Sequence, residues 1–79
     1  MIKHKEITDI DLRKSIRNYK ILLAGNSRLK IYGKLSCSSG KRMKKENRVF
    51  FKNETEANQL GFRPCGNCLR EQYLKWKLL

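Results

Sequence analysis

The feature that most constrains the fold of this chain is a pair of cysteines separated by two residues, Cys65 and Cys68, with a third thiol, Cys37, well upstream. Three thiols cannot all pair as disulfides, but a Cys-x-x-Cys turn and one remote cysteine supply three of the four ligands of a tetrahedral zinc ion. At 79 residues the chain makes one domain, and such a small domain commonly needs a metal or disulfide staple. The sequence therefore predicts a single zinc-organised domain over residues 1–79.

The fourth zinc ligand is the open question of the predicted site. His4 is the only histidine, and a neutral imidazole would complete a site of three cysteines and one histidine. Water, an acidic side chain such as Glu6, or a group from a partner are the alternatives. We carry His4 forward with Cys37, Cys65 and Cys68 as the predicted ligand set.

The first residues of the chain bear on where the protein works. The segment Met1–Glu6 has no apolar run behind its basic residues, and no stretch approaches the roughly 20 apolar residues of a membrane span. These features predict a cytoplasmic protein without a membrane partner, in a compartment where thiols stay reduced and available to metal.

Positive charge is the second strong signal. Nineteen Lys and Arg against seven acids give a net charge of +12, and no acidic residue occurs between Asp11 and Glu46. Clustered cations favour a nucleic acid partner, because neutralising phosphates releases counterions without any base-specific contact. A merely solubilising surface is the plainer alternative. The predicted phosphate-contacting residues centre on the basic loop and its flanks: Lys41, Arg42, Lys44, Lys45, Arg48, Lys34, Lys30 and Arg63.

Hydrophobic periodicity places helices at both ends of the chain and strands between them. Residues 8–20 should form a helix capped by Thr8, and 21–24 and 29–32 should pair as a hairpin around a turn at 25–28. A loop over 36–45 should carry Cys37 to a strand at 48–51.

The second half of the chain has clearer signals for where its helices begin and end. Asn53 can cap a short helix with Glu56 as its reciprocal partner, Ala57 and Leu60 facing inward, and Gly61 at its end. A terminal helix should follow Cys68, with Leu69, Tyr73 and Trp76 directed to the core or the metal, although Trp76 could instead stack on a base. The fold class is therefore α+β, a short β-sheet flanked by helices.

Four segments of the chain carry a resemblance to a known family: Lys30–Cys37, Glu46–Phe51, Glu56-Ala57 and Gly61–Cys68. Together they resemble the amino-terminal metal-binding domain of the Ada DNA-repair proteins, and the resemblance covers roughly residues 21–70. Its most specific part is Gly-Phe-Arg-Pro-Cys-x-x-Cys after a short helix and an Arg-Val-Phe-Phe strand. The resemblance implies a zinc site of four cysteines, one of which takes a methyl group from a DNA phosphotriester.

This sequence departs from the family at one position. The methyl-accepting cysteine of the family stands four residues before the second ligand, and here that residue is Gly33, while Cys37, Cys65 and Cys68 match the other three ligands. The resemblance therefore implies the fold and the zinc, and the lost thiol argues against methyl transfer.

These observations favour a zinc module that binds nucleic acid, DNA rather than RNA, without chemistry of its own. The enzymatic alternative is a stoichiometric methyl acceptor that uses Cys37 in place of the lost thiol. A protein-interaction adaptor is a further alternative, and a thioredoxin-like use of the Cys-x-x-Cys pair is disfavoured by the position of the motif near the chain end.

Overall fold

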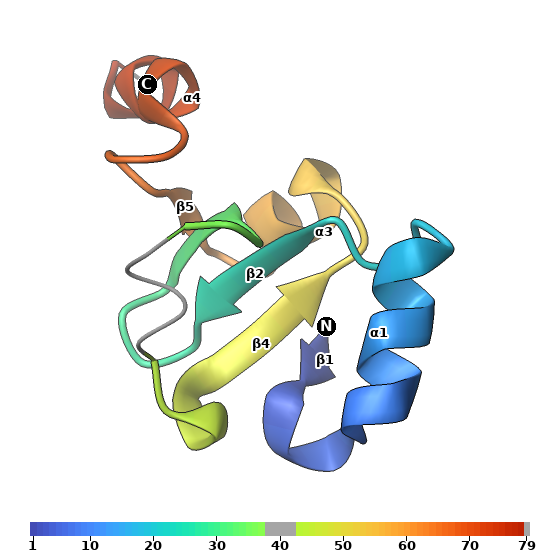
Figure 1. The fold of residues 1–79 in the computed structure, drawn as a ribbon. Coiled ribbons are helices and arrows are strands. Elements are labelled where there is room, and N and C mark those ends of the chain that lie inside the picture. The colour runs from blue at the N-terminus through green and yellow to red at the C-terminus, as the bar shows by residue number, and fades with distance from the viewer. Residues whose placement is uncertain (38–42, 79) are drawn as a thin grey trace.

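The computed structural model describes residues 1–37 and 43–78, and they form one antiparallel sheet with a single parallel edge strand (Figure 1). The strand order is β1-β4-β2-β3-β5. The described pairs are antiparallel except for β3 and β5, which run parallel at one edge. The strands are β1 (Ile2–Lys3), β2 (Leu23–Asn26), β3 (Ile31–Lys34), β4 (Arg48–Phe51) and β5 (Arg63–Pro64). The helices are α1 (Asp9–Arg17), α3 (Glu54–Gln59) and α4 (Arg70–Lys77), with 3-10 turns η1 (His4–Glu6) and η2 (Lys45–Asn47). The predicted α+β class is confirmed.

Helix α1 forms as predicted at its start and ends earlier than predicted. Thr8 caps it, and its hydroxyl accepts a hydrogen bond from the Asp11 amide at 3.2 Å. The expected extension to residue 20 is wrong, because Tyr19 has a left-handed backbone (φ 58°) that no helix continues, and its side chain is 78% exposed. Of the apolar residues predicted to line one face of this helix, Leu12 is the one that packs against the buried cluster on the sheet.

The predicted hairpin exists, displaced by two residues along the chain. Strands β2 and β3 pair antiparallel with Gly25 opposite Tyr32, so the predicted turn residues Gly25 and Asn26 belong to the strand. The side chain of Asn26 makes the turn that follows, since its Oδ1 accepts hydrogen bonds from the amides of Arg28 and Leu29. A methyl group at Gly25 would come within 2.8 Å of the Phe51 ring, which explains why this strand position carries glycine.

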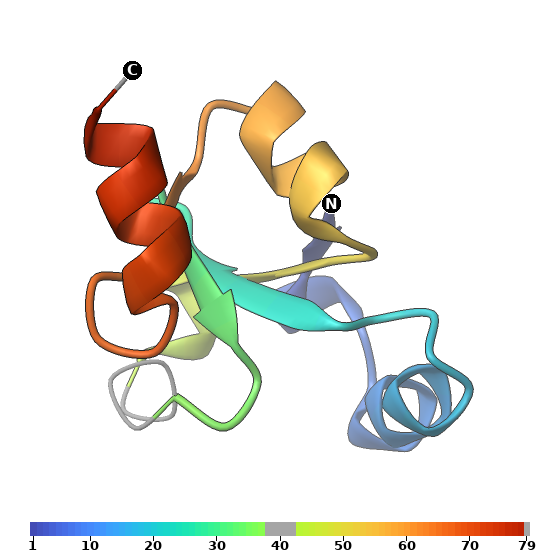
Figure 2. The same cartoon turned by 90° about the horizontal axis from the view of Figure 1, so that it is seen from above.

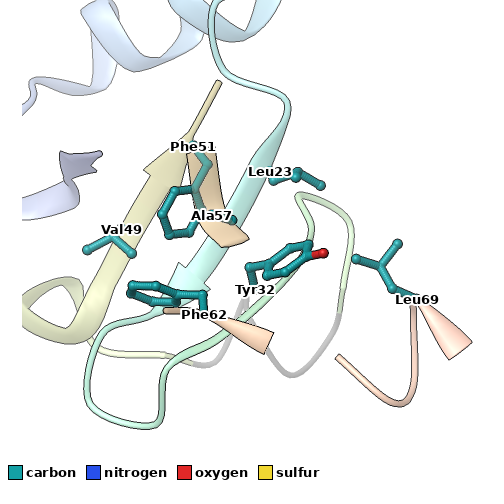
Figure 3. Close-up of a cluster of buried hydrophobic side chains, with 7 residues drawn as sticks. All are labelled: Leu23, Tyr32, Val49, Phe51, Ala57, Phe62 and Leu69. Carbon is teal, nitrogen blue, oxygen red and sulfur yellow. The ribbon is translucent and has the colours of Figure 1, made fainter. Parts of the chain in front are cut away.

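Alternating side chains of β4 divide the core between the two faces of the sheet. Val49 and Phe51 face α3, where a cluster of seven buried residues gathers around Ala57 (Figure 3). Phe50 points to the opposite face and packs with Ile21 and Ala24 beneath α1. Figure 2 shows the sheet between these two helices. The cluster in Figure 3 comprises Leu23, Tyr32, Val49, Phe51, Ala57, Phe62 and Leu69.

Helix α3 begins and ends at the predicted residues, but the predicted inward position of Leu60 is not found. The Asn53 Oδ1 accepts from the Glu56 amide at 2.9 Å, and Gly61 ends the segment with φ 83°. The Glu56 carboxylate pairs with the amino terminus at 3.0 Å instead of returning to cap the helix. The expectation that Leu60 faces inward is wrong. Helix α3 ends at Gln59, and Leu60, the residue that follows it, is 46% exposed.

The carboxyl-terminal part reaches the sheet through two short contacts. Strand β5 adds two residues to β3, and the buried Leu69 precedes α4, which itself buries no side chain completely. Tyr73 is half-buried, but the expectation of a core position for Trp76 is wrong, because 42% of its surface is exposed. In both views α4 lies at the opposite end of the molecule from α1 (Figure 1, Figure 2). Among the described residues, no helix has the length and apolar character that a bilayer crossing requires.

Candidate metal centre

The three cysteines meet at the β3–β5 edge of the sheet. The sulfur atoms of Cys37, Cys65 and Cys68 all lie within 4.8 Å of one another, although Cys37 is remote in sequence. A tetrahedral ion with Zn–S bonds of about 2.3 Å holds its sulfurs about 3.8 Å apart, so these donors fit a shared ion with small adjustments. The expected convergence of the three thiols is therefore found.

Backbone hydrogen bonds fix the cysteines to strand β3. The Cys65 amide donates to the Tyr32 carbonyl at 2.7 Å, which continues the parallel pairing of β5 into the cysteine turn. The Cys37 amide donates to the Lys34 carbonyl at 3.1 Å, so the chain turns back beside the strand end. The Lys34 amide donates in turn to the Cys68 sulfur at 3.3 Å. An N–H group directed at sulfur favours the thiolate form that binds metal.

Without a cation, burial and the neighbouring thiols oppose the ionisation of Cys68. Burial raises the pKa of Cys68 to about 11, and the neighbouring thiols of Cys37 and Cys65 add to the shift, while the Lys34 amide opposes it. Metal ligation requires the deprotonated sulfur, so a divalent ion would reverse this balance and release protons on binding. The donor set thus fits a soft divalent cation.

Gly33 occupies the sheet position that faces the sulfurs. A Cβ atom built on Gly33 would lie 2.7 Å from the Cys68 sulfur and 3.2 Å from the Cys65 Cβ. Any side chain at this position would therefore project directly into the cysteine cluster. This is the position at which the resemblance expects the methyl-accepting thiol.

The structure does not bring the fourth predicted ligand, His4, to the cysteines. His4 follows β1 at the other edge of the sheet, and β4 and β2 separate β1 from β3, a distance of about 14 Å for three strand spacings. Its buried ring packs edge-on against Phe50 with centroids 5.2 Å apart. Burial and the nearby charges of Arg48 and Lys45 lower the pKa of His4. Sequence separation alone gave no sign that the sheet would hold His4 away from the thiols.

A groove of about 480 Å³ opens beside the cysteines. Gly33, Cys37 and Cys65 lie on its wall, and Tyr73 and Gly66 close one side. Among the described residues that line it there are two cations, Lys34 and Arg63, and no carboxylate. The sequence reasoning missed this groove, because it depends on how α4 is set against β3.

The predicted nucleic-acid residues fall into separate places. Lys30, Lys34 and Arg63 lie together on the β3–β5 edge, where the Arg63 amide donates to the Lys30 carbonyl at 2.8 Å. The Arg63 guanidinium donates to the Pro64 carbonyl and lies over the rings of Tyr73 and Trp76.

The remaining basic residues precede or begin β4, or lie outside the residues that the structure describes. Lys45 approaches Asp9 at 3.8 Å, and the half-buried Arg48 lies over the Phe50 ring. This packing directs Arg48 into the protein instead of toward solvent. Lys44 is exposed, and Lys41 and Arg42 lie outside the described residues.

The fold and the cysteine cluster define a small zinc domain of mixed α and β structure, and comparison with known proteins gives its family. The family described as "Metal binding domain of Ada" matches residues 12–71, so the chain belongs to that family. Among solved structures, the refined structure of the DNA methyl phosphotriester repair domain of E. coli Ada is similar, with 25% identity and a TM-score of 0.59. The match covers 84% of this chain and 76% of that chain. No curated protein sequence matches the chain significantly.

Family membership makes zinc the cofactor of this domain, and the three close cysteines could coordinate it. The chain is thus a zinc-binding domain of the Ada type.

Proposed function

We propose that this chain is a zinc-dependent DNA-binding module that holds the ion with Cys37, Cys65 and Cys68 and does not accept methyl groups. The observation that carries the proposal is the position of Gly33, whose built Cβ lies 2.7 Å from the Cys68 sulfur. A reactive thiol in this family would extend from that backbone position, and glycine offers neither a nucleophile nor a ligand. The domain therefore keeps the scaffold of a methyl-accepting site without its acceptor.

DNA is the proposed partner because basic residues flank the metal site. Lys34 follows Gly33 directly and its backbone contacts the Cys68 sulfur, so its exposed ammonium extends from the edge of the metal site. Lys30 directly precedes the same strand and is also exposed, with its ammonium over the Phe62 ring. With a net charge of +12, the chain can hold phosphates at this edge by charge alone. Lys44 and Lys45, with Lys41 and Arg42 before them in the sequence, remain the second predicted group of phosphate-contacting residues.

The binding proposal is tested by the salt dependence of DNA affinity. Fluorescence anisotropy with a labelled duplex should show that a double variant, Lys30→Gln with Lys34→Gln, binds all sequences more weakly. The slope of log affinity against log salt should become shallower by about two, since each lost phosphate contact removes about 0.9. The matched control is Arg13→Gln with Lys14→Gln, which removes two exposed cations from α1. Equal losses from both double variants would reject the β3–β5 edge as the DNA surface.

Cys37 as a substitute methyl acceptor is the second candidate function, and its partial exposure on the groove wall is the observation in its favour. The test is to incubate zinc-loaded protein with DNA that carries methyl phosphotriesters and to measure the intact mass. We expect no gain of a methyl group. A single methyl on Cys37 would replace the binding proposal with stoichiometric repair.

A further inference from the structure

The chain offers three protein donors for an ion that takes four. Zinc is bound in proteins by cysteine, histidine and carboxylate groups. Every such residue of this chain falls within the described ranges, 1–37 and 43–78. Within those ranges the only group of three or more that could hold an ion is Cys37, Cys65 and Cys68. No fourth side-chain donor therefore lies with the three cysteines, and the fourth position is open to a group from outside the chain.

The backbone at Gly33 leaves one side of the cluster without a side chain. The two nearest atoms to a built Cβ belong to Cys68 and Cys65, so this side of the cluster faces bare strand. The groove of about 480 Å³ touches Gly33, Cys37 and Cys65 together. Its volume falls within the range of about 300–1,000 Å³ for small-molecule sites. A small ligand in the groove would therefore lie beside two of the three cysteines.

The lining of the groove indicates what kind of ligand fits. Met43, Ile31 and Tyr73 give it an apolar wall, and Lys34 and Arg63 give it positive charge without a facing carboxylate among the described lining residues. The metal end favours a soft donor, because the three donors already present are sulfur. The ligand that satisfies all three conditions has a thiolate, a short apolar stem and an anionic end.

We propose that the groove beside Gly33 is a binding site for a small anionic thiol, whose sulfur completes the ligand set begun by Cys37, Cys65 and Cys68. On binding, the thiol gives its proton to solvent and its sulfur takes the fourth position, with no change of oxidation state. Lys34 holds the anionic end of the thiol. The inference rests on the proposed ligation by the three cysteines.

The test uses cobalt in place of zinc, because the absorption of cobalt reports the sulfur donors around it. Titration of the cobalt-loaded protein with 3-mercaptopropionate should strengthen the sulfur-to-cobalt charge-transfer band to saturation. Propionate, which lacks the thiol, should leave the spectrum unchanged. With 2-mercaptoethanol, which lacks the carboxylate, saturation should need about tenfold more ligand, and Lys34→Gln should remove that difference.

Gly33→Cys is the matched control, since it supplies a fourth sulfur from the chain itself. Its cobalt spectrum should already resemble that of the thiol-saturated protein and should not respond to added thiol. Should this variant fail to take up cobalt, native mass spectrometry of the zinc-loaded wild type decides: a protein–zinc–thiol adduct supports the site, and its absence at saturating thiol overturns it. Failure of the wild type to bind one cobalt would refute the proposed ligation itself. Binding of one cobalt with no response to either thiol would refute only the groove as a ligand site.

Discussion

The two edges of the sheet are held in different ways. At the β1–β4 edge, the buried His4 packs on Phe50, and Leu12 of α1 covers the same apolar cluster. At the β3–β5 edge, Tyr32 and Phe62 are buried, but α4 beyond them buries no side chain completely and is joined to the core by Leu69. Tyr73 and Trp76 stack on each other, with ring centroids 6.0 Å apart, more than on the core.

This difference indicates where the domain depends on its metal. Apolar burial can hold the β1–β4 edge by itself, because side chains from both layers meet there. The β3–β5 edge places three thiols beside α4, a helix that buries no side chain completely. We therefore expect the metal to hold the cysteine turn and α4 in place, as apolar packing holds the β1–β4 edge.

Removing the metal should have the largest effect, and it should fall on one edge. Structural zinc contributes strongly to folding where it is bound, an apparent value of about 10–16 kcal/mol in zinc-finger peptides that lack a core of their own. We expect chelation to abolish amide protection in β5 and α4, and to leave the residual protection in β2 and β4. Hydrogen exchange followed by mass spectrometry measures this pattern. Equal protection of α4 before and after chelation would contradict the claim that the β3–β5 edge depends on the metal.

Substitutions should show that zinc affinity depends on the cysteines and does not depend on His4. We expect Cys65→Ser to weaken zinc binding by at least about 100-fold, because even supporting residues of metal sites contribute about 10–100-fold. His4→Ala is the matched control and should leave zinc affinity unchanged, since His4 lies at the other edge. Competition with a chromogenic chelator measures both affinities. A comparable loss in His4→Ala would restore His4 to the ligand set.

Adding a methyl group to the central strand should test the packing between the edges. A Cβ at Gly25 would lie 2.8 Å from the Phe51 ring and 2.9 Å from the Ile31 carbonyl oxygen, and the backbone oxygen cannot move aside easily. We expect Gly25→Ala to lower the free energy of unfolding by about 1–3 kcal/mol, as overpacking does. Urea denaturation of the zinc-loaded protein measures the change.

Gly66→Ala is the control for that substitution, because its Cβ would meet the Tyr73 ring at an ordinary 3.5 Å. Its effect on the free energy of unfolding should stay within about 0.5 kcal/mol. A larger loss in Gly66→Ala than in Gly25→Ala would mean that the cysteine turn is packed more tightly than the sheet.

The smallest expected effect is a pH dependence confined to the β1–β4 edge. Burial, with the charges of Arg48 and Lys45, lowers the pKa of His4 below its usual 6.5 in the folded state. Well above 6.5 both states are largely neutral, so His4 contributes little pH dependence there. As the pH falls below 6.5 the unfolded chain is protonated first, so stability decreases until the pH reaches the folded-state pKa.

His4→Leu isolates this contribution, because acid also displaces zinc from thiolates in both proteins. Denaturation of the zinc-loaded wild type and variant at pH values of about 7.5 to 5.5 should show the steeper decline in the wild type. Parallel pH curves would show that the buried imidazole does not titrate differently in the folded state.

Much of the site could be predicted from the sequence because its signals are local. The Cys-x-x-Cys turn, the Asn53 cap and the Arg48–Phe51 strand each depend on neighbouring residues, and each appears in the structure. The meeting of Cys37 with the other thiols also followed, because zinc chemistry demands such a group.

The failures concern tertiary placement. The exposure of Trp76 depends on how few contacts α4 makes, and the isolation of His4 depends on the strand order β1-β4-β2-β3-β5. The displaced hairpin has a local cause that the sequence did contain, the amide-accepting side chain of Asn26. Strand order and helix docking arise from contacts between distant residues, which periodicity does not encode.

X-ray absorption at the zinc edge, on protein purified without thiols, tests most directly that this chain supplies three sulfur donors and no more. We predict three sulfur atoms at about 2.3 Å and one lighter atom at about 2.0–2.1 Å from the ion. Two sulfurs with two nitrogen donors, or four sulfurs in the absence of any added thiol, would contradict it.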